Sequence, residues 1–245
     1  MADVLYSARS RLPVFLTRAR DNAIELAVYD AAGDLSAPSS GTVDIYDAAG
    51  TKVVDGAAVV VSGSKATYTV AAADVPATAS FSGQWQVRWL LTMADGVAHT
   101  FTESAYLVRW QLKPPASEAD LTERHQEIGD LIDSGDDLSQ FLRVAWEQIV
   151  RRLLRDGRAP SLILDSFALL DLQVYLALSI IYADAASSLS NAGRYADLSK
   201  DYTERFEHEW STITWTYDAD GDGLADPDER GAAGQPSLWL APPRL

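Results

Sequence analysis

The chain has 245 residues, 47% of them hydrophobic, and a formal net charge of −15 from 20 basic and 35 acidic residues. That length suits two ordinary domains, and that hydrophobic content excludes global disorder. The acidic balance argues against a protein that clamps nucleic acid, because such binding neutralises phosphates with cations, although DNA could still slide past without sticking. The absence of cysteine excludes disulfides, thiolate metal sites and cysteine nucleophiles.

Neither a signal peptide nor a membrane span is predicted. Residues 1–20 contain no apolar run of signal-peptide length. The longest apolar stretch further along is interrupted by Asp165, Asp171 and Gln173, so we expect no segment that reaches membrane-spanning length. The sequence therefore predicts a soluble protein made in the cytoplasm.

The N-terminal part alternates hydrophobic and polar residues, as in AIELAVYD and WQVRWLL. This period of two is typical of half-buried β-strands. Turn sequences such as DAAG and MADGV separate about seven such runs, a number that fits an antiparallel immunoglobulin-like β-sandwich. We assign the sandwich to residues 1–112 and expect Trp85 and Trp89 in its core, because large aromatic side chains are normally buried.

The stretch QLKPPASEAD changes the pattern. Its two prolines cannot continue a strand, and its Ser and Asp signal a helix start, so residues 113–117 are predicted to be a linker. Beyond it, the hydrophobic spacing predicts a helical bundle over residues 118–216, giving a multi-domain α+β chain. Four helices, mostly antiparallel, are expected: one with Leu121, His125, Ile128 and Ile132 on a stripe, one from Leu138 to Leu153, an almost wholly apolar one from about Ser161 to Asn191, and one from Tyr195 to Trp210.

Enzyme chemistry finds little support in the sequence. There are three histidines, His99, His125 and His208, and none has a titratable partner at the spacing of a known motif. There is no nucleophile elbow, phosphate-cradling glycine loop or pair of histidines on one helix face. We therefore expect no enzyme and no catalytic residue.

A basic cluster stands out in the otherwise acidic chain. It comprises Arg143, Arg151, Arg152, Arg155 and Arg158. One interpretation is a solvated or ion-pairing helix face. The other is a contact patch for an acidic surface on another copy of the chain. The sequence leaves both interpretations open.

Residues 217–230, YDADGDGLADPDER, have the spacing of a calcium loop. Gly223 stands in the sixth position of the loop, where the chain must turn sharply. Closely packed carboxylates repel one another unless a cation lies between them. The predicted ligands of a structural Ca²⁺ are Asp218, Asp220, Asp222, the backbone carbonyl of Leu224, Asp226 and Glu229.

This loop resembles the calcium loops of EF-hands and of thrombospondin-type or dockerin repeats. It departs from an EF-hand because Gly231, Gly234 and Pro236 would break the exiting helix. The sequence thus predicts a lone structural loop and not a paired sensor, with Ca²⁺ favoured over Mg²⁺, which takes fewer protein ligands.

The last segment, residues 231–245, is predicted to be an extended arm. It is too rich in Gly and Pro for a helix, yet it carries Leu238, Trp239 and Leu240. Exposing such a cluster of hydrophobic side chains is costly, so the arm is expected to dock on its own bundle or on a neighbouring subunit.

From about Glu118 to the C-terminus, the chain resembles the head-to-tail connector (adaptor) proteins of long-tailed bacteriophages. The resemblance lies in the helix order, in the long apolar segment SLILDSFALLDLQVYLALSIIY, and in the aromatic DYTERFEHEW helix that leads into the C-terminal arm. It implies a homo-oligomeric ring, usually a dodecamer, below the portal protein of the capsid. The arm, Pro236–Leu245, would then anchor on the portal, with these partner-binding residues: Leu238, Trp239, Leu240, Arg244 and Leu245.

The same resemblance implies a virion protein of the neck, at the head–tail interface, assembled in the host cytoplasm. The ring would receive a tail-side stopper or tail-terminator protein, and DNA would pass through its lumen without specific binding. An acidic or neutral lumen wall would suit this passage, because the duplex would not be gripped. The N-terminal sandwich resembles the immunoglobulin-like decorations of phage structural proteins, which would place it on the outer side of the ring.

Two other functions are alternatives to the connector. A calcium-dependent surface- or carbohydrate-binding module, as in an adhesin, would use the sandwich for recognition, but an export signal is not predicted. A metal-dependent hydrolase needs an open coordination position and a general base, and the sequence indicates neither.

Overall fold

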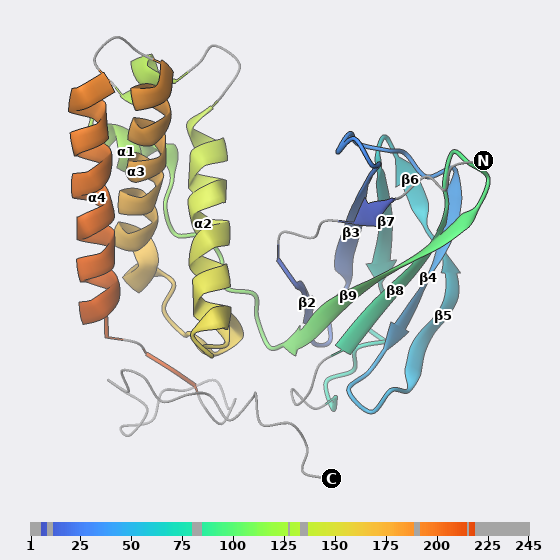
Figure 1. Cartoon of the computed structure of the whole chain (residues 1–245). Coiled ribbons are helices and arrows are strands. Elements are labelled where there is room, and N and C mark those ends of the chain that lie inside the picture. Colours follow the sequence, from blue (N-terminus) through green and yellow to red (C-terminus); the bar gives the residue numbers. More distant parts are fainter. Residues whose placement is uncertain are drawn as a thin grey trace. The chain divides into compact units, whose positions relative to one another are not determined.

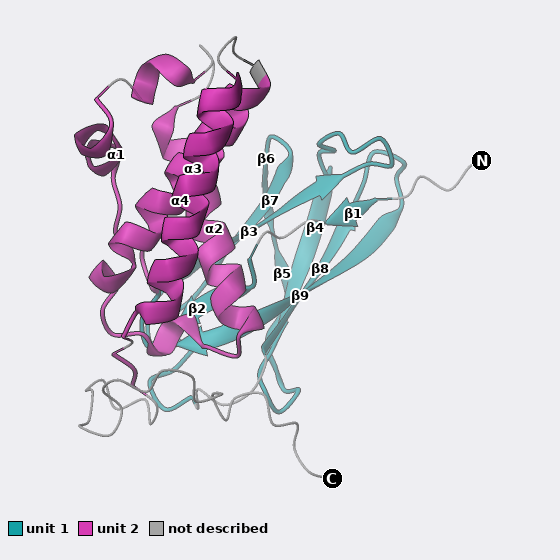
Figure 2. Ribbon diagram, turned by 60° about the vertical axis from the view of Figure 1, so that its left-hand side comes forward, with its two compact units in different colours: residues 1–111 teal, residues 112–245 magenta. Residues whose placement is uncertain are grey.

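The structure, a computed structural model, describes residues 6–8, 12–79, 85–126, 128–132, 137–188, 192–214 and 216–218. The chain divides into two compact units, residues 1–111 and 112–245, coloured separately in Figure 2. The described strands lie in the first unit and the described α-helices in the second. The fold is therefore α+β.

The first unit contains two sheets (Figure 1). One has the strand order β1-β3-β7-β6 and the other has the order β2-β9-β8-β4-β5. The strands are β1 (Ser7–Ala8), β2 (Val14–Thr17), β3 (Asn22–Tyr29), β4 (Ser40–Tyr46), β5 (Lys52–Ala58), β6 (Val60–Ser62), β7 (Lys65–Val70), β8 (Trp85–Thr92) and β9 (Ala98–Val108).

Both sheets contribute to one hydrophobic core. In β3 and β8, buried and exposed side chains alternate, as the sequence pattern predicts. Leu26 of β3, Ile45 of β4 and Trp89 of β8 belong to the same buried cluster. The expected burial of Trp85 and Trp89 is confirmed, since their exposed fractions are 3% and 0%.

The expectation of purely antiparallel strands is wrong at one pair, because β2 runs parallel to β9. β1 pairs with β3 in one sheet, so the chain changes sheets between β1 and β2. The described strands number nine, whereas about seven were predicted. Strands as short as β1 and β2 show no clear alternation of hydrophobic and polar residues, so the sequence pattern does not reveal them. The buried Asn22 fixes the turn after β2: its side chain accepts from the Thr17 amide at 2.6 Å and donates to the Thr17 carbonyl at 2.9 Å.

In the second unit, helices α2, α3 and α4 pack side by side, and successive helices run in opposite directions (Figure 1). Their buried faces form a core that includes Phe141, Ala145, Leu178 and Tyr202. Short 3₁₀ turns, labelled η, join some of them. The elements are α1 (Glu118–Arg124), η1 (Ile128–Leu131), α2 (Leu138–Arg155), η2 (Pro160–Leu162), η3 (Phe167–Leu169), α3 (Leu170–Ser188) and α4 (Ala192–Thr212).

Two of the predicted helices differ from the structure. The first is split, because α1 ends at Arg124 and His125 adopts an extended backbone as its C-cap. The third begins at Leu170 and not near Ser161. Before it, Ile163 forms a β-bridge with Tyr217, and the Asp165 carboxylate accepts a hydrogen bond from the Phe167 amide at 2.9 Å. Both contacts require a non-helical backbone.

We expected no segment long enough and apolar enough to span a membrane. By length and composition, one helix of the described residues meets these criteria. Within the described residues, Phe167–Ser187 is long and apolar enough to cross a membrane. Half of that segment is buried inside the helical unit. The core helix of a soluble protein passes the same test, so this property alone does not assign the segment to a membrane.

A buried glutamine, Gln173, hydrogen-bonds the segment before α1 and so connects it to the helices of the second unit. Gln173, 1% exposed on α3, accepts a hydrogen bond from the Ala116 amide at 3.0 Å. Its side-chain amide donates to the Leu142 carbonyl of α2, also at 3.0 Å. One polar side chain thus links the segment before α1 to two helices, which explains why a glutamine lies inside an apolar helix.

Candidate functional site

The last described residues are held by the loop that precedes α3. Ile163 and Tyr217 form an antiparallel bridge. The Leu164 amide donates to the Thr216 carbonyl at 3.1 Å, and the Asp218 amide donates to the Leu162 carbonyl at 2.9 Å. We call this arrangement, residues 159–164 with 216–218, the clasp. It holds the last described residues against the loop before α3.

Tyr217 reinforces the clasp through its phenol. The Ala159 amide donates to the Tyr217 hydroxyl at 2.6 Å, and that hydroxyl donates to the Ala159 carbonyl at 3.2 Å. Burial raises the pKa of Tyr217 to about 12, against smaller opposing effects of the Ala159 hydrogen bond and the Arg158 charge. The phenol therefore stays neutral well above physiological pH.

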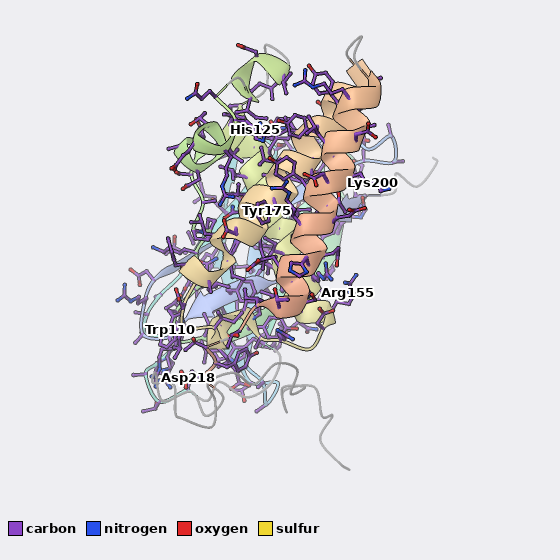
Figure 3. All side chains as sticks on the ribbon, turned by 90° about the vertical axis from the view of Figure 1, so that its left-hand side faces the viewer. Trp110, His125, Arg155, Tyr175, Lys200 and Asp218 are labelled. Carbon is purple, nitrogen blue, oxygen red and sulfur yellow. The ribbon has the colours of Figure 1, made fainter. Side chains whose placement is uncertain are left out.

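Asp218, the first predicted calcium ligand, ends the clasp and is only 1% exposed. Figure 3 shows it at the opposite end of the helical unit from His125. The other predicted ligands, Asp220, Asp222, Leu224, Asp226 and Glu229, lie outside the described residues. Within the part of the chain that the structure describes, no group of three or more His, Asp or Glu side chains could hold a metal ion. The calcium site stays a prediction.

The predicted partner-binding residues of the arm also lie outside the described residues, so the arm too stays a prediction. They are Leu238, Trp239, Leu240, Arg244 and Leu245.

The structure gives several members of the basic cluster an ionic partner within the chain. Arg143 pairs with Glu147 at 2.9 Å, and Arg155 pairs with its neighbour Asp156 at 3.5 Å. These contacts favour the interpretation of the cluster as an ion-pairing helix face.

Arg152 has the most elaborate environment of the cluster. Two of its guanidinium nitrogens lie 2.6 and 2.7 Å from the two carboxylate oxygens of Glu207 on α4. The guanidinium also lies 4.3 Å from the centre of the Trp210 ring and 5.3 Å from that of Phe206. The planar group thus forms a two-point ion pair and stacks on aromatic faces, joining α2 to α4. The pKa of Glu207 is lowered, chiefly by its hydrogen bond to Arg152.

The histidines differ in their surroundings. His208 is exposed on α4. His99 lies 3.0 Å from Asp95 between ring nitrogen Nε2 and Oδ2, and it meets Tyr6 edge-on at 4.9 Å. The sequence interpretation missed this His99–Asp95 pair, whose only signal is a spacing of four residues across the β8–β9 turn.

His125 belongs to an aromatic cluster that the sequence interpretation also missed. Its Nε2 hydrogen-bonds the hydroxyl of Tyr202 on α4, and its ring meets the edge of Tyr182 on α3 at 5.6 Å. Tyr182 stacks on Tyr202 at 5.8 Å and on Tyr195 at 6.2 Å. The sequence predicted the helices that carry these tyrosines, but it could not show that the tyrosines surround one histidine.

Within the described part of the chain, one side of α3 carries apolar side chains that are not fully buried. Leu176 and Ile180 are partly buried and Ala183 is exposed, although each is apolar and the spacing of four and three residues places them along one stripe. We call these three residues the α3 stripe. Apolar surface of this kind on a helix is favourable to bury against another surface.

Comparisons with known proteins add little. No protein-family model and no curated protein matches the chain. A solved structure named pT26-6p is similar at 10% identity, with 86% of this chain and 49% of that chain covered and a TM-score of 0.19. The chain thus spans about half the length of that protein. A TM-score this low carries no argument about fold or function.

Proposed function

We propose that the protein is a structural virion component: an adaptor ring that joins the capsid portal to the tail and lets DNA pass. The sequence resemblance to phage head-to-tail connectors supports this proposal. The main structural support for the proposal is the α3 stripe, because a ring needs each helical unit to bury apolar surface against its neighbour.

The clasp supports the part of the proposal that concerns the arm. It anchors residues 216–218 on the loop before α3 through two backbone hydrogen bonds and the Tyr217 phenol. An arm that starts from a fixed point loses less conformational freedom on docking than one that starts from a free tail. A Ca²⁺ ion held by residues 218–229 would extend this fixed start toward the arm.

For the first unit, we propose an immunoglobulin-like β-sandwich, and its strand order supports this. Lettering β1, β3, β7 and β6 as A, B, E and D reproduces one immunoglobulin sheet. Strands β4, β8 and β9 then take the places of C, F and G in the other sheet, with β5 beside β4 as C′. This unit would serve as a decoration on the outer side of the ring, within the neck of the virion.

Assembly can be tested by changing the α3 stripe. Leu176→Glu with Ile180→Glu places two charges on the surface proposed to meet a neighbour, and we expect single copies where the unchanged protein forms rings in mass photometry. Leu90→Glu, at a 44% exposed position of the first unit, is the matched control and should leave the rings intact. Circular dichroism would verify that each variant is folded. Rings that persist in the folded double variant would overturn the assignment of this surface.

Docking can be tested separately. Deleting Ser237–Leu245 should leave both units folded and abolish binding to a portal assembly. Binding that survives the deletion would show that the arm is wrongly assigned.

A further inference from the structure

Helix α1 is attached to the bundle by a small set of contacts. Its one buried side chain is Leu121. Arg124 forms an ion pair with Asp171 and donates to the Tyr175 hydroxyl at 3.3 Å, and its guanidinium lies 5.3 Å from that ring. These groups are exposed or partly exposed. An element held this way can open locally at a lower free energy than the bundle core.

His125, the C-cap of α1, makes a further contact between α1 and the bundle. Its amide donates to the Leu121 carbonyl at 3.0 Å, which ties the ring position to the end of the helix. The ring lies nearly perpendicular to the stacked rings of Tyr182 and Tyr202, whose centres are 5.6 and 5.5 Å away, and its Nε2 hydrogen-bonds the Tyr202 hydroxyl. The imidazole therefore joins α1 to both α3 and α4 (Figure 3 labels it).

The charges nearest this ring do not favour an imidazolium. Arg205 on α4 lies over the Tyr202 ring at 5.2 Å, and the adjacent residue on α1 is Arg124. The nearby carboxylates are already paired, Asp171 of α3 with Arg124 and Asp201 of α4 with Arg205 at 2.9 Å. The tyrosines that face the ring stay neutral, and the pKa of Tyr182 is raised to about 12 by burial. Burial and the charge of Arg205 lower the pKa of His125.

We propose that α1 and its capping histidine form a proton-controlled latch, which is closed while His125 is neutral and released when it is protonated. The direction follows from linkage. A histidine whose pKa is lower in the closed state binds a proton more readily when α1 is detached. The closed state is thus fully favoured above the ordinary pKa of about 6.5 and loses stability as the pH falls below it.

Release would have a local consequence. Ala116 remains bound to Gln173 and Asp137 still caps α2, so the chain stays attached on both sides of the latch. The rings of Tyr182 and Tyr202 would lose their contact with the imidazole. Acid would therefore expose an aromatic surface on α3 and α4 without unfolding the bundle.

Hydrogen exchange of the full chain tests the latch. Peptides covering Glu118–Arg124 should exchange faster at about pH 5.5 than at about pH 7.5, after correction for intrinsic exchange rates. The increase should be at most about tenfold, because a single proton with an ordinary pKa of about 6.5 is involved. His125→Gln should abolish this difference, whereas His208→Gln, at an exposed position of α4, should retain it. Equal protection of α1 at both pH values, or an unchanged difference in His125→Gln, would overturn the proposal.

A titration that needs no substitution at the histidine completes the test. In the unchanged protein, the imidazole signal of His125 should titrate, by NMR, below the ordinary histidine pKa of about 6.5. Arg205→Gln should raise the pKa of His125 toward its ordinary value and weaken the pH effect on α1, because one opposing charge is removed. A His125 that titrates at or above the ordinary pKa of about 6.5 would contradict the latch whatever the variants show.

Discussion

Among single residues, Tyr217 has a direct influence on how the last described residues are held against the loop before α3. Tyr217→Phe removes a hydroxyl that accepts from and donates to Ala159. We expect the free energy of unfolding to fall by about 1–2 kcal/mol, the usual cost of a lost buried hydrogen bond. Urea unfolding followed by far-ultraviolet circular dichroism measures it. Tyr106→Phe, which alters no group of the helical unit, is the control.

The same phenol predicts a dependence on alkaline pH. Its pKa is raised from 10.0 to about 12, so the unfolded chain loses the phenolic proton first. The contribution of Tyr217 is complete below pH 10 and is lost as the pH rises toward 12. Tyr182 titrates in the same range, so Tyr217→Phe should reduce this alkaline loss of stability without abolishing it. Identical profiles for the two proteins would contradict the raised pKa.

Arg152 gives a second prediction at this scale. Arg152→Lys keeps the positive charge but loses the two-point contact with Glu207 and the planar stack on Trp210. We expect a loss of about 1 kcal/mol in unfolding free energy. Arg155→Lys should change it by less than about 0.5 kcal/mol, because Arg155 is exposed and forms its ion pair with the neighbouring Asp156 at the end of the helix. Equal effects would show that the stack contributes nothing.

Residue environments could be predicted from the sequence where local spacing determines them. The alternation in WQVRWLL placed Trp85 and Trp89 in the core, as found. The partners of Arg152 and His125 could not be found this way, because Glu207 and Tyr202 are 55 and 77 residues away along the chain. Such pairs depend on how the helices pack, and spacing within one helix does not encode that.

At the scale of elements, Gln173 connects three segments. Gln173→Met would keep a similar volume but leave the Ala116 amide without its acceptor. We expect a loss of about 1–3 kcal/mol, the cost of an unsatisfied buried polar group. Gln140→Met on the exposed face of α2 should be almost neutral. Thermal unfolding of the two variants measures this loss, and a Gln173→Met variant as stable as the control would contradict the linking role of Gln173.

Element type was more predictable than element boundaries. Hydrophobic period correctly separated a strand-rich unit from a helical one, and α2 begins at Leu138 as expected. The start of α3 was placed too early because the apolar stretch from Leu162 to Leu169 fits a helix by composition. Its actual backbone is set by the bridge to Tyr217, which joins residues 54 positions apart. A contact over that distance leaves no local signal.

At the scale of the whole molecule, the acidic loop predicts a response to calcium. Asp220→Ala with Asp222→Ala removes two predicted ligands, so the melting temperature in calcium should fall and become insensitive to a chelator. The unchanged protein should lose stability on chelation. Differential scanning calorimetry with and without Ca²⁺ measures both. An unchanged protein indifferent to chelator, with no saturable heat on calcium titration, would remove the ion from the account.

Self-association is the central claim of this account, and imaging tests it most directly. Negative-stain electron microscopy of the full chain, alone and with a portal assembly, should show closed rings, or single copies that form a ring only on the portal. A protein that stays a single copy in both preparations would contradict the adaptor function, and glycan binding by that single copy would favour the surface-binding alternative.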